Sequence, residues 1–598
     1  MSEIIVGIDL GTTNSEIAVY RAGRPQVLAD DAGRLILPSV VGLDDAGGLL
    51  VGEEARNQFL LAPERTVRSI KRRMGSDDTV SLAGQSYRPQ EISAIILKRL
   101  KETAERRLGQ AVAKAVITVP AYFSDTQRQA TREAGEIAGL EVVRIINEPT
   151  AAALVYEAGQ HQGKRILVYD LGGGTFDVSI VRIEEGVVEV ISSHGNNHLG
   201  GDDFDQKIVG HILDHLKIKQ GVEVSGSPQA MARILRSAEA AKKHLSDHPF
   251  ARIEEEYLIE SGGRPVHLAL ELEREHYETM IAPFIEETME AIHIALKGAG
   301  LTASQVEEIL LVGGATRTPM IRRRLEQVFG LAPRGEVDAD LCVAMGAAIQ
   351  GAAIAGDEVS AVLVDVTPYT FGTSALGELD GEPYPYCFIP IIPKNTPIPV
   401  RKSEVFYTIR DHQREVEVRI YQGEDRDARR NIQLGEFRVD GLSNAPAGNP
   451  IVLDLALDRD GILKVSAREK KTGLEHRITI DRALSRYDQG DLERARLRID
   501  SLFDDRDDDD REDAEGDEGD DDIQGAEGGS DGAGITADAD LDGLLARAGA
   551  KLDSVGEEDR NELIDLIETT RDALAAGDRA AVATARQQLT DLLFYLET

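Results

Sequence analysis

The sequence predicts a multidomain chain: a two-lobed α/β region, then an antiparallel β-domain, then a C-terminal α-helical bundle. Three observations support this order. Two acidic hairpin turns, at Asp9 and Asp170, recur 161 positions apart, as expected for a duplicated lobe. Strict alternation of apolar residues marks stretches within 366–482, and leucines at helical spacing mark 541–598.

Length and composition exclude several classes of protein. A chain of 598 residues, 42% apolar and 29% charged, is long enough for three or four domains with buried cores. Cys342 and Cys387 lie far apart without metal-ligand spacing, so we expect neither a disulfide framework nor a zinc site. The N-terminus lacks a basic signal segment, and no apolar run approaches membrane-spanning length. We therefore expect a cytoplasmic protein that does not bind membranes.

The net charge of −38 argues against binding nucleic acid through its phosphates. The charge is also uneven, because residues 504–522 hold fourteen acids and two arginines, a net charge of −12. Such a block repels itself and stays solvated. We interpret it as a disordered linker rather than as a calcium site or a tail for a basic partner.

The stretch 170–177 (DLGGGTFD) predicts the tight turn of a β-hairpin, because apolar runs flank it on both sides. Its three consecutive glycines have no Cβ, so their backbone N–H groups can approach a phosphate closely. Asp170 ends the first strand with a carboxylate suited to a metal ion or its waters. The stretch 8–14 (IDLGTTN) repeats this pattern. Together the two turns predict a clamp that closes on one phosphate from both sides.

The α/β region extends from residue 4 to about 355. The sequence predicts a helix over 91–108, a strand over 116–119, a helix over 124–139 and a strand over 142–146. Ser124 and Gln127 have the spacing of a capping box. Glu148 follows the last strand at the start of a helix. It is either a catalytic carboxylate or an ordinary acid interacting with the helix dipole.

Two glycine pairs add to the predicted phosphate site. Gly200 and Gly201 precede a predicted helix, and Gly313 and Gly314 follow an apolar strand over 309–312. Each pair can present the amides of a helix N-terminus to an anion. The sequence thus has four glycine turns that each follow a strand and precede a helix or a strand, which is more than loop formation alone requires.

The chain divides into six predicted parts. Strict alternation at 415–420 and 453–457 indicates the β-domain, and a helical stretch follows at 489–502. The parts are an α/β domain (1–357), a linker (358–365), the β-domain (366–482), a helical segment (483–503), an acidic disordered linker (504–538) and a helical bundle (539–598).

Five motifs resemble the heat-shock protein 70 (DnaK-like) chaperone family over nearly the whole chain. They are 7–15 (GIDLGTTNS), 117–123 (ITVPAYF), 144–153 (RIINEPTAAA), 169–177 (YDLGGGTFD) and 311–314 (LVGG). The short segment after 71–75 and the stretch 390–399 (PIIPKNTPIP) are more similar to the HscC-type branch. The resemblance implies a two-lobed ATPase domain of the actin/hexokinase-like fold, a β-sandwich that binds peptides, and a helical lid.

The resemblance implies a site for ATP or ADP with Mg²⁺ and K⁺. The implied catalytic residues are Lys71, Glu148, Asp170, Thr175 and Asp177. The implied nucleotide-binding residues are Asp9, Gly11, Thr12, Thr13, Asn14, Gly172, Gly173, Gly174, Gly200, Gly201, Glu239, Lys242, Ser246, Gly313, Gly314, Arg317 and Asp340. Asp9 and Asp170 would hold Mg²⁺ largely through water. Without the resemblance, Lys71 would be one cation on a basic face.

Further positions match the family's coupling and peptide-binding residues. The coupling set is Pro120, Arg128, Arg144, Asn147, Leu363 and Asp365, and the peptide-binding set is Leu376, Phe406, Ile409, Val416 and Val418. The implied partners are unfolded or extended apolar polypeptides, a J-domain co-chaperone and a nucleotide exchange factor. The resemblance also implies that the protein is mostly monomeric. The acidic stretch interrupts the expected lid, which predicts faster and less gated peptide release.

Two other functions share part of this pattern. A small-molecule kinase of the same fold would have both phosphate turns, but it gives no role to a linker and a β-domain. A scaffold that binds ATP without hydrolysis would be favoured by loss of Lys71, Glu148 or Thr175, and all three are present. An ATP-driven chaperone is therefore the favoured hypothesis.

Overall fold

The computed structural model describes residues 3–157, 163–184, 186–334, 338–359, 362–459, 461–479, 487 and 489–512. The predicted bundle over 539–598 and most of the predicted acidic linker lie outside these residues. None of the helices in the described ranges is both long and apolar enough to cross a membrane.

The first lobe is built on a sheet in the order β11-β10-β1-β2-β3, with β4 beside β2. These strands are β1 (Ile5–Leu10), β2 (Asn14–Arg21), β3 (Arg24–Val27), β4 (Leu37–Pro38), β10 (Lys114–Val119) and β11 (Glu141–Asn147). Helices α2 (Pro89–Leu108) and α3 (Asp125–Ile137) share its apolar core, and α3 begins with the predicted Ser124–Gln127 capping box. Around it lie β5 (Val40–Leu43), β6 (Leu49–Val51), α1 (Glu53–Gln58), β7 (Thr66–Arg68), β8 (Val80–Leu82) and β9 (Gln85–Tyr87).

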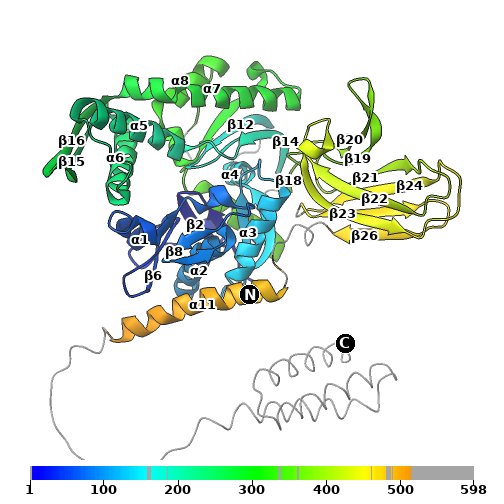
Figure 1. Cartoon of the computed structure of the whole chain (residues 1–598), viewed down its shortest axis with the longest axis horizontal. Coiled ribbons are helices and arrows are strands. Elements are labelled where there is room, and N and C mark those ends of the chain that lie inside the picture. The colour runs from blue at the N-terminus through cyan, green and yellow to red at the C-terminus, as the bar shows by residue number, and fades with distance from the viewer. Residues whose placement is uncertain are drawn as a thin grey trace, which may run out of the picture. The chain divides into compact units, whose positions relative to one another are not determined.

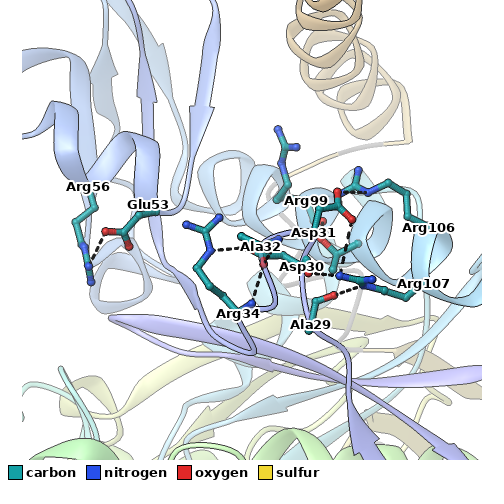
Figure 2. A network of polar contacts seen from close by, with 11 residues as sticks. Ala29, Asp30, Asp31, Ala32, Arg34, Glu53, Arg56, Arg99, Arg106 and Arg107 are labelled. Atoms are coloured by element: carbon teal, nitrogen blue, oxygen red, sulfur yellow. Dashed lines mark hydrogen bonds and ion pairs between the residues drawn. The ribbon is translucent and has the colours of Figure 1, made fainter.

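A polar network fastens the loop after β3 to the C-terminal end of α2 (Figure 2). Arg107 donates a hydrogen bond from Nε to the carbonyl oxygen of Ala29 at 2.7 Å. Arg106 pairs with Asp31 at 3.2 Å, and Arg34 donates from Nε to Asp30 at 2.7 Å. These contacts fix the outer rim of the first lobe.

The second lobe repeats the central arrangement of the first. Its sheet has the order β17-β12-β13-β14-β18, in which β12 pairs antiparallel with β13 and parallel with β17. In the first lobe, β1 likewise pairs antiparallel with β2 and parallel with β10. The strands are β12 (Lys164–Leu171), β13 (Phe176–Glu184), β14 (Val187–Asn196), β17 (Glu308–Val312) and β18 (Val362–Val364). The structure thus confirms the predicted duplication and both hairpins.

Helices and a long hairpin complete the second lobe. They are α5 (Gly201–Gln220), α6 (Pro228–Asp247), β15 (Phe250–Ser261), β16 (Arg264–Glu273), α7 (Arg274–Ala299) and α8 (Pro319–Phe329). Helices α4 (Glu148–Glu157) and α9 (Cys342–Ala355) pack with strands of both lobes in one shared core. The two helices touch closely, because a Cβ on Gly346 of α9 would lie 1.9 Å from the carbonyl oxygen of Ala151. Glycine in α9 therefore permits the close packing of the two helices.

The β-domain consists of two four-stranded antiparallel sheets, in the orders β20-β19-β22-β23 and β21-β24-β25-β26. Its strands are β19 (Phe371–Leu379), β20 (Glu382–Ile392), β21 (Val400–Tyr407), β22 (Glu415–Gln422), β23 (Ile432–Asp440), β24 (Pro450–Leu457), β25 (Leu463–Glu469) and β26 (Glu475–Thr479). Alternate residues of both sheets, including Ile420 and Leu455, meet in one apolar core. The alternation in the sequence therefore predicted the buried faces correctly.

Two segments differ from their sequence-based description. The predicted linker contains β18, which pairs in parallel with Val187–Glu189 at the edge of the second lobe's sheet. Helix α11 (Gln489–Glu512) runs along the first lobe (Figure 1) and extends nine residues into the stretch predicted as disordered linker. Its turn around Ile499 is buried in the first lobe's core. Once packing nucleates a helix, adding residues to its end costs little, which explains the extension.

Candidate nucleotide site

The predicted catalytic side chains converge at the meeting point of the two lobes. Asp9 is the last residue but one of β1, Asp170 is the last but one of β12, Asp177 is the second residue of β13 and Glu148 begins α4. Lys71 comes from the 3₁₀ helix η2 (Ile70–Arg73), and its Nζ forms a buried ion pair with Glu148 Oε1. Residues far apart in the chain thus form one charged cluster inside the protein.

The cluster carries excess negative charge. Burial, with the nearby charge of Glu148, raises the pKa of Asp9 and of Asp177 to about 7, and raises the pKa of Asp170 well above its usual value. Burial alone would lower the pKa of Lys71, but Glu148 and Asp9 raise it above its usual value. The cluster lines a cavity between the two turns. Among the described residues that line this cavity, Lys71 is the one cation. The site is therefore suited to bind additional positive charge.

Two buried polar atoms here have no protein partner: Asp170 Oδ2 and Thr13 Oγ1. Asp9 is oriented by a hydrogen bond from Thr118 Oγ1 at 2.9 Å. Buried polar atoms normally have partners, so an orphan carboxylate oxygen and an orphan hydroxyl fit a hydrated cation and a phosphate. Within the described ranges no three His, Cys, Asp or Glu side chains form a metal cage. The unpartnered oxygen of Asp170 and the nearby carboxylate of Asp9 are the groups that would fit a Mg²⁺ that keeps most of its waters.

The two phosphate turns face each other at close range. A Cβ on Gly173 would lie 1.9 Å from Thr13 Oγ1, so with Thr13 in its present conformation glycine is needed between the turns. The amide of Gly172 donates to the carbonyl oxygen of Thr175 at 3.1 Å, which closes the second turn. Gly201 donates from its amide to the carbonyl oxygen of Gly172 at 3.0 Å. Asp202 likewise donates from its amide to the carbonyl oxygen of Gly173. The first amides of α5 thus support the turn, so the prediction that this helix N-terminus presents them to an anion is wrong.

Most of the predicted nucleotide residues line one cavity. These residues are Asp9, Gly11, Thr12, Thr13, Asn14, Lys71, Glu148, Asp170, Gly172, Gly173, Thr175, Gly313, Gly314 and Asp340. Gly174 and Gly200 belong to the adjoining backbone, where a Cβ on Gly200 would lie 2.5 Å from Gly174 N. Asp177 accepts a hydrogen bond from the amide of Tyr122 at 2.9 Å. The structure therefore brings together most of the residues that the family resemblance implies, and their roles at a nucleotide stay predictions.

The residues predicted to hold the adenosine lie farther out. Glu239 lines a second cavity together with Thr12, Thr13 and Asn14. Lys242 donates from Nζ to Asp205 at 2.8 Å and to the carbonyl oxygen of Gly201 at 3.0 Å. Ser246 lies one turn further along α6. Arg317 pairs with Asp340 at 2.7 Å at the rim of the first cavity.

Sequence reasoning missed several residues near the site. Glu16 of β2 is buried in the cavity that contains Asp9 and Lys71. Burial, together with the charge of Asp9, raises the pKa of Glu16 well above the usual value. An acid inside the apolar run of a predicted strand was a usable signal. Ser69, Arg72 and Asp203 also escaped notice, because their partners are distant in the sequence.

The predicted coupling residues also cluster. Arg128 donates from Nη2 to Asn147 Oδ1 at 2.5 Å, and Asn147 donates from Nδ2 to Asp365 Oδ2 at 2.9 Å. Arg144 and Leu363 line a cavity next to β18 together with these three residues. Pro120 directly follows β10, and its carbonyl oxygen accepts a hydrogen bond from the amide of Phe123 at 3.1 Å. The linker strand is therefore joined to the junction that carries Glu148.

Polar contacts also connect the β-domain with the first lobe. Tyr369 donates from its hydroxyl to the carbonyl oxygen of Tyr122 at 2.8 Å. Gln422, at the end of β22, donates from Nε2 to Asp125 Oδ2 at 3.0 Å. These contacts link β22, which also carries predicted peptide-binding residues, to the first turn of α3.

The predicted peptide-binding residues differ in exposure. Leu376 and Ile409 are 57% and 61% exposed and leave apolar surface open on the β-domain. Phe406 and Val416 are partly buried against the domain core. Val418 is only 6% exposed and packs in that core. The structure thus gives Val418 a packing role and leaves Leu376 and Ile409 available for contact.

The geometry defines a two-lobed protein with a charged cavity between two glycine-containing turns, to which a linker strand and a β-domain are attached. The family model described as "Hsp70 protein" matches residues 5–83 and 76–587. The chaperone protein DnaK of Thermotoga neapolitana is 49% identical over 488 residues, which is 80% of each chain. The DnaK proteins of Thermotoga maritima and Thermosipho africanus are each 48% identical, also over 80% of each chain.

The chain belongs to the Hsp70 family. It is an ATP-dependent chaperone, and its enzymatic activity is that of an ATPase. The relatives named here carry the DnaK name, and assignment to the HscC-type branch stays a prediction.

Proposed function

We propose that this chaperone captures extended apolar segments of unfolded proteins and that ATP binding and hydrolysis in the two-lobed domain control their capture and release. The buried Lys71–Glu148 ion pair beside both phosphate turns carries the proposal. Phosphoryl transfer to water needs positioning, a cation near the γ-phosphate and a metal ion, but no covalent nucleophile. The site offers this set of groups. A small-molecule kinase would leave the linker contacts and the β-domain without a role.

In this proposal each group has a distinct task. Lys71 places a positive charge at the γ-phosphate and the attacking water, while Glu148, Asp177 and Thr175 orient that water. Asp9 and Asp170 would hold a hydrated Mg²⁺, which would neutralise phosphate charge, and a K⁺ would add to this neutralisation. Backbone amides around Gly11–Thr13 and Gly172–Gly174 hold the phosphates. Glu239, Lys242, Ser246 and Arg317 surround the adenosine.

The β-domain would hold the client. We interpret its two sheets as a β-sandwich and the two lobes as an actin/hexokinase-like fold. An extended peptide would gain backbone hydrogen bonds from strand edges and contact Leu376, Ile409 and Phe406 through its side chains. The cluster of Arg128, Asn147 and Asp365 would report nucleotide state to the linker and receive a J-domain co-chaperone. A nucleotide exchange factor would complete the cycle in the cytoplasm.

Single-turnover ATP hydrolysis, with and without a short apolar peptide, tests the proposal. We expect slow hydrolysis by the wild type, acceleration by the peptide, and loss of hydrolysis in Lys71→Ala. Arg73→Ala is the matched control, because Arg73 is an exposed cation on the same 3₁₀ helix. Hydrolysis by Lys71→Ala at the wild-type rate would contradict the role given to this lysine.

A further inference from the structure

The 3₁₀ helix η2, which carries Lys71, is held from the opposite lobe on both sides of that lysine. Ser69, just before η2, donates from Oγ to Asp202 Oδ2 at 2.7 Å. Arg72, just after Lys71, donates from Nη2 to Asp203 Oδ1 at 3.0 Å and to the carbonyl oxygen of His198 at 2.9 Å. The two acids are neighbours in the first turn of α5.

Ser69 has an unusual backbone for a residue with a side chain. Its φ is 53°, in the left-handed region that favours glycine. This bend starts η2 and precedes the buried Lys71. Glycine would adopt the backbone more readily, but it could not supply the hydroxyl that reaches Asp202. The hydrogen bond to the second lobe is thus made from a strained position, as is common at functional sites.

The same turn of α5 also holds the phosphate turn. The amide of Asp202 donates to the carbonyl oxygen of Gly173 at 2.7 Å. The stem of Arg72 lies against the turn as well, because a Cβ on Gly174 would come 2.9 Å from Arg72 Cγ. The start of α5 therefore fixes η2 and the glycine turn relative to each other.

We propose that Asp202 and Asp203 are positioning residues for Lys71, acting through Ser69 and Arg72 so that the lysine reaches its place only when the lobes are closed. This inference rests on the proposed role of Lys71 at the γ-phosphate. Neither acid touches the reacting atoms in this account. Their loss lets η2 shift relative to the phosphate turn, which slows hydrolysis more than it weakens nucleotide binding.

Two double-mutant cycles test the inference: Arg72→Ala with Asp203→Asn, and Ser69→Ala with Asp202→Asn. The readouts are the single-turnover hydrolysis rate at saturating ATP and the dissociation constant of ATP. A misplacement of about 1 Å can cost up to about a hundredfold in rate, so we expect each single change to slow hydrolysis by about tenfold. Each double variant should be no slower than its slower single parent, because both changes break the same contact.

The dissociation constant separates positioning from general damage. We expect it to change by less than about threefold, which also shows that the variants fold. Arg73→Ala should match the wild type in both readouts. Wild-type hydrolysis rates in Arg72→Ala and Ser69→Ala, with none in Lys71→Ala, would overturn the inference and leave the proposed function standing. Wild-type hydrolysis in Lys71→Ala would overturn both.

Discussion

Asn147 joins the linker to Glu148, the proposed catalytic carboxylate: its side-chain amide donates to Asp365 Oδ2 at 2.9 Å, and the next residue in the chain is Glu148. The oxygen of the same side-chain amide accepts a hydrogen bond from Arg128 Nη2 at 2.5 Å. A shift of the linker therefore acts on the first turn of α4, where Glu148 meets Lys71. This relationship gives the proposed coupling a physical path through few residues.

Replacing Asp365 should uncouple the domains. In Asp365→Ala the linker loses its hydrogen bond to Asn147, and such bonds to charged groups contribute about 1.5–3 kcal/mol. We expect stimulation of hydrolysis by an apolar peptide to fall by about tenfold, with basal hydrolysis still measurable. Glu358→Gln is the control, because it changes an exposed acid in the same linker. Full stimulation in Asp365→Ala would contradict this path.

Docking of the β-domain should depend on pH through Asp125. Burial raises the pKa of Asp125 from 3.8 to about 7, against the opposing charge of Arg128. Asp125 accepts a hydrogen bond from Gln422 of the β-domain, so we expect undocking to expose this carboxyl and return its pKa toward 3.8. Docking therefore takes up a proton, so its stabilisation is complete below pH 3.8 and is lost as the pH rises to about 7. We expect docking, followed by a fluorescence pair on the two domains, to weaken between pH 5 and 7 and to level off above. Asp125→Asn should flatten this profile, and an unchanged profile would contradict the assignment.

A side chain at Gly173 should weaken ATP binding. The added methyl group in Gly173→Ala would lie 1.9 Å from Thr13 Oγ1, so the Thr13 side chain must rotate away or the two phosphate turns must separate. We expect ATP affinity, measured by calorimetry, to fall by roughly tenfold or more. Gly210→Ala in α5 is the control, because its Cβ meets nothing within 4 Å. That change should preserve ATP affinity and stabilise the helix by about 1 kcal/mol.

Helix α11 should depend on one buried side chain for its place on the first lobe. Ile499 is 0% exposed in the first lobe's core, and Lys98 forms an ion pair with Asp500 beside it. Ile499→Ala should weaken docking of α11 by about 2–5 kcal/mol. Hydrogen exchange of the α11 amides measures this loss. Leu497→Ala, at a residue 64% exposed on the same helix, should leave exchange unchanged.

Local pattern predicted much of the fold and of the site. Hairpins at Asp9 and Asp170, the capping box at Ser124 and the alternating strands of the β-domain follow from apolar periodicity and turn residues, which act over short distances. The gathering of nucleotide residues followed from their motifs. Lys71 became a candidate only through the family resemblance, because one lysine on a basic face carries no local signal.

Contacts between distant segments escaped prediction. Ser69 and Asp202 are 133 positions apart, and neither the left-handed backbone of Ser69 nor its partner has a local sequence signature. The pairing of β18 with β14 and the burial of Ile499 in the first lobe also depend on tertiary packing. The end of α11 was misplaced for a similar reason. Its acidic composition favours disorder, whereas the docked turn before it favours a helix.

Release of a bound peptide tests the central claim most directly. A fluorescent apolar peptide is first bound to the protein in the presence of ADP. Excess unlabelled peptide is then added together with ATP or ADP, and the dissociation rate of the fluorescent peptide is measured. The account predicts faster release in ATP, in the wild type and also in Lys71→Ala, because ATP binding acts on the linker before hydrolysis. Equal release rates in ATP and ADP would show that the nucleotide site does not control the β-domain, and would contradict the account.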